Sequence, residues 1–212
     1  MDVVRKSGEF LKSSVLVFLV VICLGNSGCT AGKISVAKIQ KAKGTIEVRF
    51  SADSRFAAAE DGTQIAVGGA AKTGEDSTTQ VVFTDRAMVF LKPESFFEVG
   101  SGPTLGRQNA GTGIYSVDKT GKDTRIETPH GVTAVLGTRF LLEVNASGTI
   151  VLVDEGKVSF TNPNGNSREI NSRERLIVPA VGPLPAPEKI DPITCDQIFR
   201  PALPATPGFN QR

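Results

Sequence analysis

The strongest constraint on the fold is an alternation of apolar and polar residues with a period of two, which begins near Ile34 and continues to Val178. Such alternation places every second side chain on the same face of a β-strand. The clearest segments are rich in β-branched residues and Phe: TIEVRF (45–50), VVFTD (81–85), AMVFL (87–91), FFEVG (96–100), RFLLEV (139–144), TIVLVDEGKVSF (149–160) and RLIV (175–178). The pattern predicts an all-β domain of short strands.

Turn-forming segments separate these strands. EDG (60–62), TGED (73–76), NASG (145–148) and NPNG (162–165) contain the Gly, Asn and Asp residues that tight turns favour. Many short strands with frequent turns are typical of sandwiches, barrels and solenoids. The segment 101–122 is instead rich in Gly and polar residues. We expect it to be a long loop or a hairpin between two halves of the sheet structure.

The N-terminal segment has the pattern of an export signal. Three basic residues, Arg5, Lys6 and Lys12, precede the apolar run VLVFLVVICL (15–24). A helix of this length reaches about half way across a hydrocarbon core of ~30 Å, which favours a cleaved signal helix over a permanent membrane span. We therefore expect residues 1–28 to be a signal peptide and the protein to be exported.

Cys29 is a candidate for lipidation. It follows NSG (26–28) in a segment that resembles the lipobox of bacterial lipoproteins, although Asn26 stands where an apolar residue is usual. The alternatives are simple secretion with Cys29 as a free thiol, or cleavage nearer Gly25. Because Thr30 lacks the aspartate that commonly retains lipoproteins at the inner membrane, we expect an outer-membrane lipoprotein that faces the periplasm or the surface.

Proline dominates the C-terminal segment. Eight of the twelve prolines lie between Pro179 and the C-terminus. Proline removes a backbone donor and fixes φ, so we expect the sheet to end near Val178 and a Pro-rich tail over 181–212 to be extended or disordered.

One stretch of this tail, DPITCDQIF (191–199), has the pattern of a short helix. Asp191 can cap a helix that starts at Pro192. Its apolar residues, Ile193, Ile198 and Phe199, are then expected to pack on the domain and to bury Cys195 as a small hydrophobic residue.

Composition excludes several classes of function. The 24 basic and 22 acidic residues nearly cancel and are scattered, so nucleic acid is not an expected partner. With one His and few cysteines, the chain lacks the clustered ligands of a zinc site, and we expect neither metal nor cofactor. The single His, His130, follows a proline and precedes a glycine. We interpret it as a structural residue at a strand corner, because no motif supplies an acid or nucleophile beside it.

Four landmarks recur in a fixed order along the chain. They are a T-G-x-x-S turn (Thr73, Gly74, Ser77), a T-P pair (Thr128, Pro129), a G-T-x-F segment (Gly137, Thr138, Phe140) and an E-G-x-V segment (Glu155, Gly156, Val158). Together they resemble the FecR-type domain over about residues 44–180. Leu136 departs from the pattern, since the family often has Arg there.

The resemblance implies a twisted β-solenoid or roll-like stack of short strands, with a β-sandwich as the alternative. We divide the chain into a signal peptide (1–28), an anchor or linker (29–43), the FecR-like domain (44–180) and the tail (181–212). Regulatory members of the family carry a cytoplasmic anti-sigma segment and a secretin/TonB-type domain, and we expect this chain to lack both.

The resemblance also implies a non-enzymatic binding or sensing module of the bacterial cell envelope, which interacts with a protein partner and takes part in signalling. The alternative is a structural lipoprotein that associates with peptidoglycan or another glycan. An enzyme with His130 as general base is the third hypothesis, and the sequence nominates no partner group for it.

Overall fold

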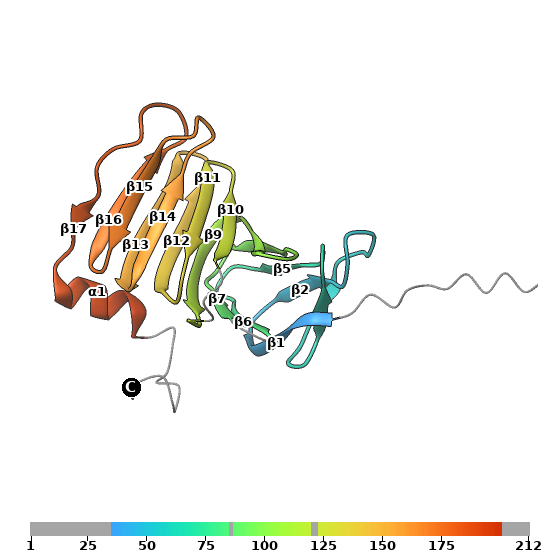
Figure 1. Ribbon diagram of the computed structural model, residues 1–212. Helices are drawn as coiled ribbons and strands as arrows, with labels where there is room; N and C mark the ends of the chain where they lie inside the picture. Colours follow the sequence, from blue (N-terminus) through green and yellow to red (C-terminus); the bar gives the residue numbers. More distant parts are fainter. Residues whose placement is uncertain (1–34, 85–86, 120–122, 201–212) are drawn as a thin grey trace, which may run out of the picture. The chain divides into compact units, whose positions relative to one another are not determined.

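The computed structural model describes residues 35–84, 87–119 and 123–200 (Figure 1). Within these ranges the chain forms many short strands and one short helix, so the all-β prediction is confirmed. The strands pair into two sheets, A and B, which share the long strand β9. The predicted signal peptide and Cys29 lie outside the described residues.

Sheet A is antiparallel throughout. Its strands follow the order β4-β1-β6-β7-β9-β12-β13-β16-β17. Their bounds are β1 Ser35–Lys43, β4 Gln64–Ala66, β6 Thr78–Phe83, β7 Ala87–Leu91, β9 Thr104–Val117, β12 Arg139–Asn145, β13 Gly148–Glu155, β16 Glu174–Pro179 and β17 Glu188–Lys189.

Sheet B has the order β3-β2-β5-β8-β9-β10-β11-β14-β15, with one parallel pair, β9 with β10. The bounds of its other strands are β2 Ile46–Arg49, β3 Ala57–Ala58, β5 Ala70–Thr73, β8 Phe96–Val99, β10 Thr124–Thr128, β11 Gly131–Val135, β14 Lys157–Thr161 and β15 Ser167–Asn171. From β6 onward the chain passes repeatedly from one sheet to the other, which gives a roll-like stack of two layers.

The core lies between the two sheets. Phe83 of sheet A meets the ring edge of Phe97 of sheet B at a centroid distance of 6.3 Å, and Phe97 in turn meets Tyr115 at 6.2 Å. In strands such as β7, buried residues that face the core alternate with more exposed ones. Burial of these apolar side chains is the main source of stability, at about 1.5–3 kcal/mol for each large side chain.

Where every residue of a crossover from one sheet to the other is described, that crossover contains a residue with positive φ, in the left-handed region. These residues are Gly44, Gly62, Gly68, Asp76, Glu94, Gly111, Gly137, Gly156 and Arg173, with φ between +54° and +92°. A residue with positive φ turns the chain sharply, which lets a strand leave one layer and start in the other. Glycine is favoured here because other residues lose about 1–2 kcal/mol in this conformation.

Two predicted segments are corrected by the structure. Residues 35–43, placed in the anchor or linker, form β1 and pair with β4 and β6. The Gly-rich segment 101–122, expected to be a loop or a hairpin, is mostly the continuous strand β9. A strand can carry these glycines because Gly106 lies against the ring of Phe97, where a Cβ would come within 2.3 Å of Cζ.

The C-terminal segment also packs on the domain, where we expected an extended or disordered tail. Leu184 is buried in the core, and Arg168 of β15 donates hydrogen bonds to the carbonyl oxygens of Leu184 and Pro185, both at 3.1 Å. The segment after β16 therefore covers the edge of β15. The chain then forms β17 and the helix α1, Pro192–Phe199.

Helix α1 confirms the predicted helix in most details. Asp191 is its N-cap, and the Asp191 carboxylate accepts a hydrogen bond from the Thr194 amide at 2.9 Å. Cys195 and Phe199 are buried, but Ile193 is 70% exposed and does not pack on the domain. The buried side packs on the outer face of sheet A (Figure 1). No helix among the described residues is long and apolar enough to cross a membrane.

Candidate functional site

The T-G-x-x-S landmark forms a hydrogen-bonded corner between β5 and β6. The Thr73 hydroxyl donates to the Lys92 carbonyl at 2.6 Å and accepts from the Ser95 amide at 2.9 Å. The Ser77 hydroxyl accepts from the Thr45 amide at 2.8 Å, and the Gly74 amide donates to the Thr45 carbonyl. These buried side chains therefore satisfy backbone groups at a point where the strand ladders are interrupted.

Thr128 and His130 belong to a chain of hydrogen bonds at the corner between β10 and β11. The Thr149 hydroxyl donates to Thr128 Oγ1 at 3.3 Å, and Thr128 Oγ1 donates to the Gly131 carbonyl at 3.1 Å. Since the one Thr149 proton is used in this way, Nδ1 of His130, 2.9 Å from Thr149 Oγ1, must be the donor. Pro129, between these residues, is exposed. The arrangement supports the structural interpretation of His130.

The G-T-x-F and E-G-x-V landmarks meet at one crossover. Thr138 Oγ1 donates to the Lys157 carbonyl at 3.1 Å. Gly156 lies close to the Gly137 carbonyl oxygen, and a Cβ at position 156 would be only 3.0 Å from that oxygen. Phe140 and Val158 follow these turns and are fully buried in the core. The sequence landmarks are thus placed at corners of the stack.

Glu155 belongs to a charged cluster on the outer side of sheet A. Arg139 forms ion pairs with Asp154 and, at 3.2 Å, with Glu155. The Cys195 thiol donates to Asp154 Oδ1 at 3.4 Å. Burial raises the pKa of the Cys195 thiol to about 11, and the neighbouring Asp154 carboxylate adds to the shift. Such a thiol stays protonated near neutral pH and is a poor nucleophile.

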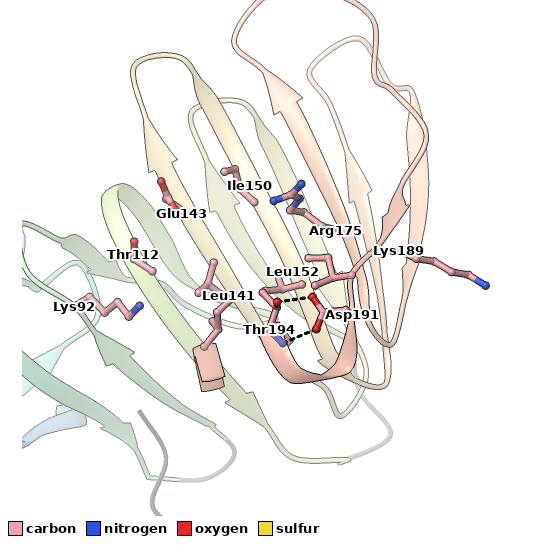
Figure 2. A pocket seen from close by; sticks show the side chains of 12 residues that line it. Lys92, Thr112, Leu141, Glu143, Ile150, Leu152, Arg175, Lys189, Asp191 and Thr194 are labelled. Carbon is pink, nitrogen blue, oxygen red and sulfur yellow. Dashed lines mark hydrogen bonds between the residues drawn. The ribbon is translucent and has the colours of Figure 1, made fainter. Parts of the chain in front are cut away.

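A groove lies on the outer face of sheet A. We call it the α1 groove; it has a volume of about 450 Å³ and runs beside the helix (Figure 2). Its lining residues come from sheet A, from Lys92 just after β7, from the segment that leads into α1 and from α1 itself: Lys92, Thr112, Leu141, Glu143, Ile150, Leu152, Arg175, Lys189, Ile190, Asp191, Thr194 and Ile198.

The floor of the α1 groove is built from two rows of outward-facing residues. In the first row Phe90, Ile114, Leu141, Leu152 and Arg175 lie opposite one another on successive strands. Helix α1 covers most of this row, since Cys195 and Phe199 pack with its aliphatic members. The second row, which is not part of the cluster under the helix, forms the open part of the floor and consists of Thr112, Glu143, Ile150 and Ile177.

Charged side chains also line the α1 groove. Arg175 pairs with Glu188, its Nε donating at 2.8 Å. Lys92 and Glu143 are half-buried, and neither forms an ion pair within the described ranges. The hydrogen bonds to Thr194 lower the pKa of the Asp191 carboxyl, which therefore stays ionised at the helix N-terminus. Apolar and charged lining residues together are the usual components of a surface that binds another molecule.

No group of three His, Cys, Asp or Glu side chains in the described part of the chain is arranged to hold a metal ion. Leu136, at the position where the family often has Arg, is 52% exposed.

Comparison with protein families identifies the central part of the chain. Residues 69–159 match the family model described as FecR protein. The chain contains a FecR domain. The match runs from the start of β5 into β14 and includes each of the four landmarks.

Solved structures share the fold of part of the chain. Two crystal structures of a candidate anti-sigma factor from Parabacteroides distasonis ATCC 8503, at 1.65 Å and 2.50 Å resolution, each give a TM-score of 0.53 at 18% sequence identity. Each alignment covers 61% of this chain and 62% of the other, so the chain spans less than two thirds of that protein. No protein with a curated description matches the chain.

The α1 groove extends beyond the FecR domain. Its floor on β9, β12 and β13 lies within the family match, but Arg175 and the wall formed by 189–198 lie outside it. The groove therefore combines residues inside the family match with residues C-terminal to it.

Sequence reasoning placed the landmarks but missed the groove. One signal was present: Ile114, Leu141 and Leu152 make their strands apolar on both faces, and an amphipathic helix follows in the sequence. Strands that are apolar on both faces need cover on both sides.

Proposed function

We propose that this chain is a non-enzymatic binding module of the bacterial cell envelope, which engages a protein partner through the α1 groove. The observation that carries the proposal is the position of this groove, in which a FecR domain supplies the floor and a C-terminal helix supplies the wall. The likeness to a candidate anti-sigma factor supports a regulatory setting with protein partners.

The test is site-specific photo-cross-linking of the full chain in native envelopes. A photoreactive residue at Ile177, beside the groove, is compared with one at Val132, which is exposed on the outer face of sheet B. We expect one protein to be linked from position 177 and not from 132. Equal labelling from both positions, or recovery only with purified sacculi, would contradict a groove-specific protein partner.

We also propose that the chain is exported and anchored by a lipid on Cys29, with the outer membrane as its address. This proposal is supported by the residues 1–30 alone. A Cys29→Ser variant should move from the membrane fraction to the soluble envelope fraction and should lose incorporation of labelled fatty acid. Retention in the membrane without label would instead indicate an uncleaved signal helix.

A further inference from the structure

The uncovered part of the groove floor is a single row of side chains across neighbouring strands. Lys92 donates its amide hydrogen to the Thr112 carbonyl, and Thr112, Glu143, Ile150 and Ile177 lie opposite one another in the sheet A register. Ile177 is 46% exposed and continues the apolar surface of Ile150. Adjacent strands lie about 4.8 Å apart, so the row from Thr112 to Ile177 is about 14 Å long.

We propose that the occupant of the α1 groove is an amphipathic α-helix of the partner protein, laid across the strands beside α1; this inference rests on the proposed function. The choice of a helix over an extended segment follows from the hydrogen bonds that the backbone of the occupant requires. The floor of the groove on β9, β12 and β13 is a sheet face, because each of these strands is paired on both sides. An extended segment placed there would leave many of its N–H and C=O groups unpaired against Ile150 and Leu152, whereas a helix pairs these groups internally.

Helix α1 shows that this face of sheet A accepts a helix. It covers the first row, where Ile114, Leu141 and Leu152 pack against Cys195 and Phe199. The second row is the next row of the same face, and Ile198 and Ile190 line the groove between the two. A second helix beside α1 would bury the exposed part of Ile177 and the outer sides of these wall residues.

The charges of the floor define the helix that fits. Lys92 and Glu143 are half-buried, lie two strands apart, and form no ion pair in the described part of the chain. A bound helix satisfies both if it presents an acidic residue to Lys92 and a basic residue to Glu143. Two strand spacings, about 10 Å, correspond to about seven helical residues, and positions i and i+7 lie on the same helix face.

The partner is thus an amphipathic helix with an apolar stripe flanked by an acidic and a basic residue about two turns apart. Opposite charges at these two points would fix the direction of the helix in the groove.

The experiment measures the spacing of contacts along the partner. Photoreactive residues are placed one at a time at Thr112 and Ile177 of the full chain in native envelopes, and the linked partner residues are identified by mass spectrometry. Over about 14 Å a helix advances about ten residues and an extended chain about four. Two cross-links to one protein about ten residues apart would support the proposal.

The other outcomes distinguish a failure of the helix proposal from a failure of the proposed function. Cross-links about four residues apart overturn the helix and leave the proposed function intact. Cross-links from both positions to a second copy of this chain also overturn the proposal, because the occupant would then not be a helix of a different protein. Labelling from neither position overturns the proposed function itself.

Charge reversal at Glu143 tests the charges assigned to the bound helix. Glu143→Lys should lower the cross-linking yield at position 177 at least about tenfold, because it opposes the basic residue of the partner. Glu47→Lys, a matched reversal at an exposed site on sheet B, should leave the yield unchanged. Equal yields from Glu143→Lys and Glu47→Lys would overturn the assigned polarity. Circular dichroism of each variant checks that it is folded.

Discussion

The ring of Phe140 stacks on the ring of Tyr115, with centroids 4.9 Å apart and planes 11° from parallel. The two residues lie opposite each other on β12 and β9. The Tyr115 hydroxyl, fully buried, donates to Oε1 of Gln108 at 2.8 Å, and Gln108 donates to the Ala110 carbonyl. Since Gln108 belongs to the half of β9 in sheet B, this set of contacts joins the two layers at the strand they share.

Tyr115→Phe should therefore destabilise the domain by about 1–3 kcal/mol, because it leaves Oε1 of Gln108 buried without a donor. Chemical denaturation measures the change in free energy of unfolding. Combining it with Gln108→Leu, which removes the orphaned acceptor, should cost less than the sum of the single variants. A Tyr115→Phe variant as stable as the parent would show that the hydrogen bond contributes nothing.

Crossover residues provide a matched pair of opposite predictions. Gly156→Ala should destabilise by about 2 kcal/mol, because φ is +89° and the new Cβ would lie 3.0 Å from both the Gly137 carbonyl and Thr138 Oγ1. Glu94 occupies a crossover with φ +54°, and Glu94→Gly should stabilise by about 0.5–1 kcal/mol.

Thermal unfolding of both variants checks this pair. Shifts of the melting temperature in the same direction would contradict the role assigned to the left-handed residues.

The strands could be predicted where burial is one-sided, since a strand such as β7 alternates cleanly. Strand β9 could not, because its glycines make room for neighbouring rings: Gly106 lies against Phe97, and Gly113 lies near Tyr115. From the sequence alone, a glycine that accommodates a ring on its own or a neighbouring strand cannot be distinguished from a glycine in a loop. Long-range packing overrides local propensity here.

The candidate site shows the same division. The cap at Asp191 and the burial of Cys195 follow from local pattern and were predicted. The groove depends on which strands become neighbours, because Thr112, Glu143 and Ile177 are far apart in the sequence and meet only through the sheet register. Ile193 was expected to pack but is exposed, since the helix turns its Cys195 and Phe199 side to the sheet.

Cys195 makes stability depend on pH in the alkaline range. Its pKa is about 11 in the folded protein, above the ordinary value of 9.0, through burial and the Asp154 carboxylate. The folded state therefore holds a proton that the unfolded chain releases, and stability is full below pH 9 and falls between about 9 and 11.

The full loss, reached above about pH 11, should be on the order of 3 kcal/mol for a shift of this size. Denaturation at pH 8 and pH 10 measures about half of this loss, and Cys195→Ala should flatten the difference within this window. Tyr115 also has a raised pKa through burial, which affects stability only above its ordinary value of 10.0. An unchanged slope in Cys195→Ala would assign the pH dependence to other groups.

The N-cap controls how firmly α1 covers the first row of the groove floor. Asp191 accepts the Thr194 amide hydrogen at 2.9 Å, and Cys195 lies one residue further along, fully covered. In a Cys23→Ser, Cys29→Ser background, Asp191→Ala should raise the rate of thiol labelling at Cys195 several-fold at constant pH, because loss of the cap frees the first turn. Asp191→Ser, which keeps a side-chain acceptor, should restore slow labelling. If the Ala and Ser variants both label at the parent rate, docking of α1 depends on Phe199 and its apolar contacts and not on the cap.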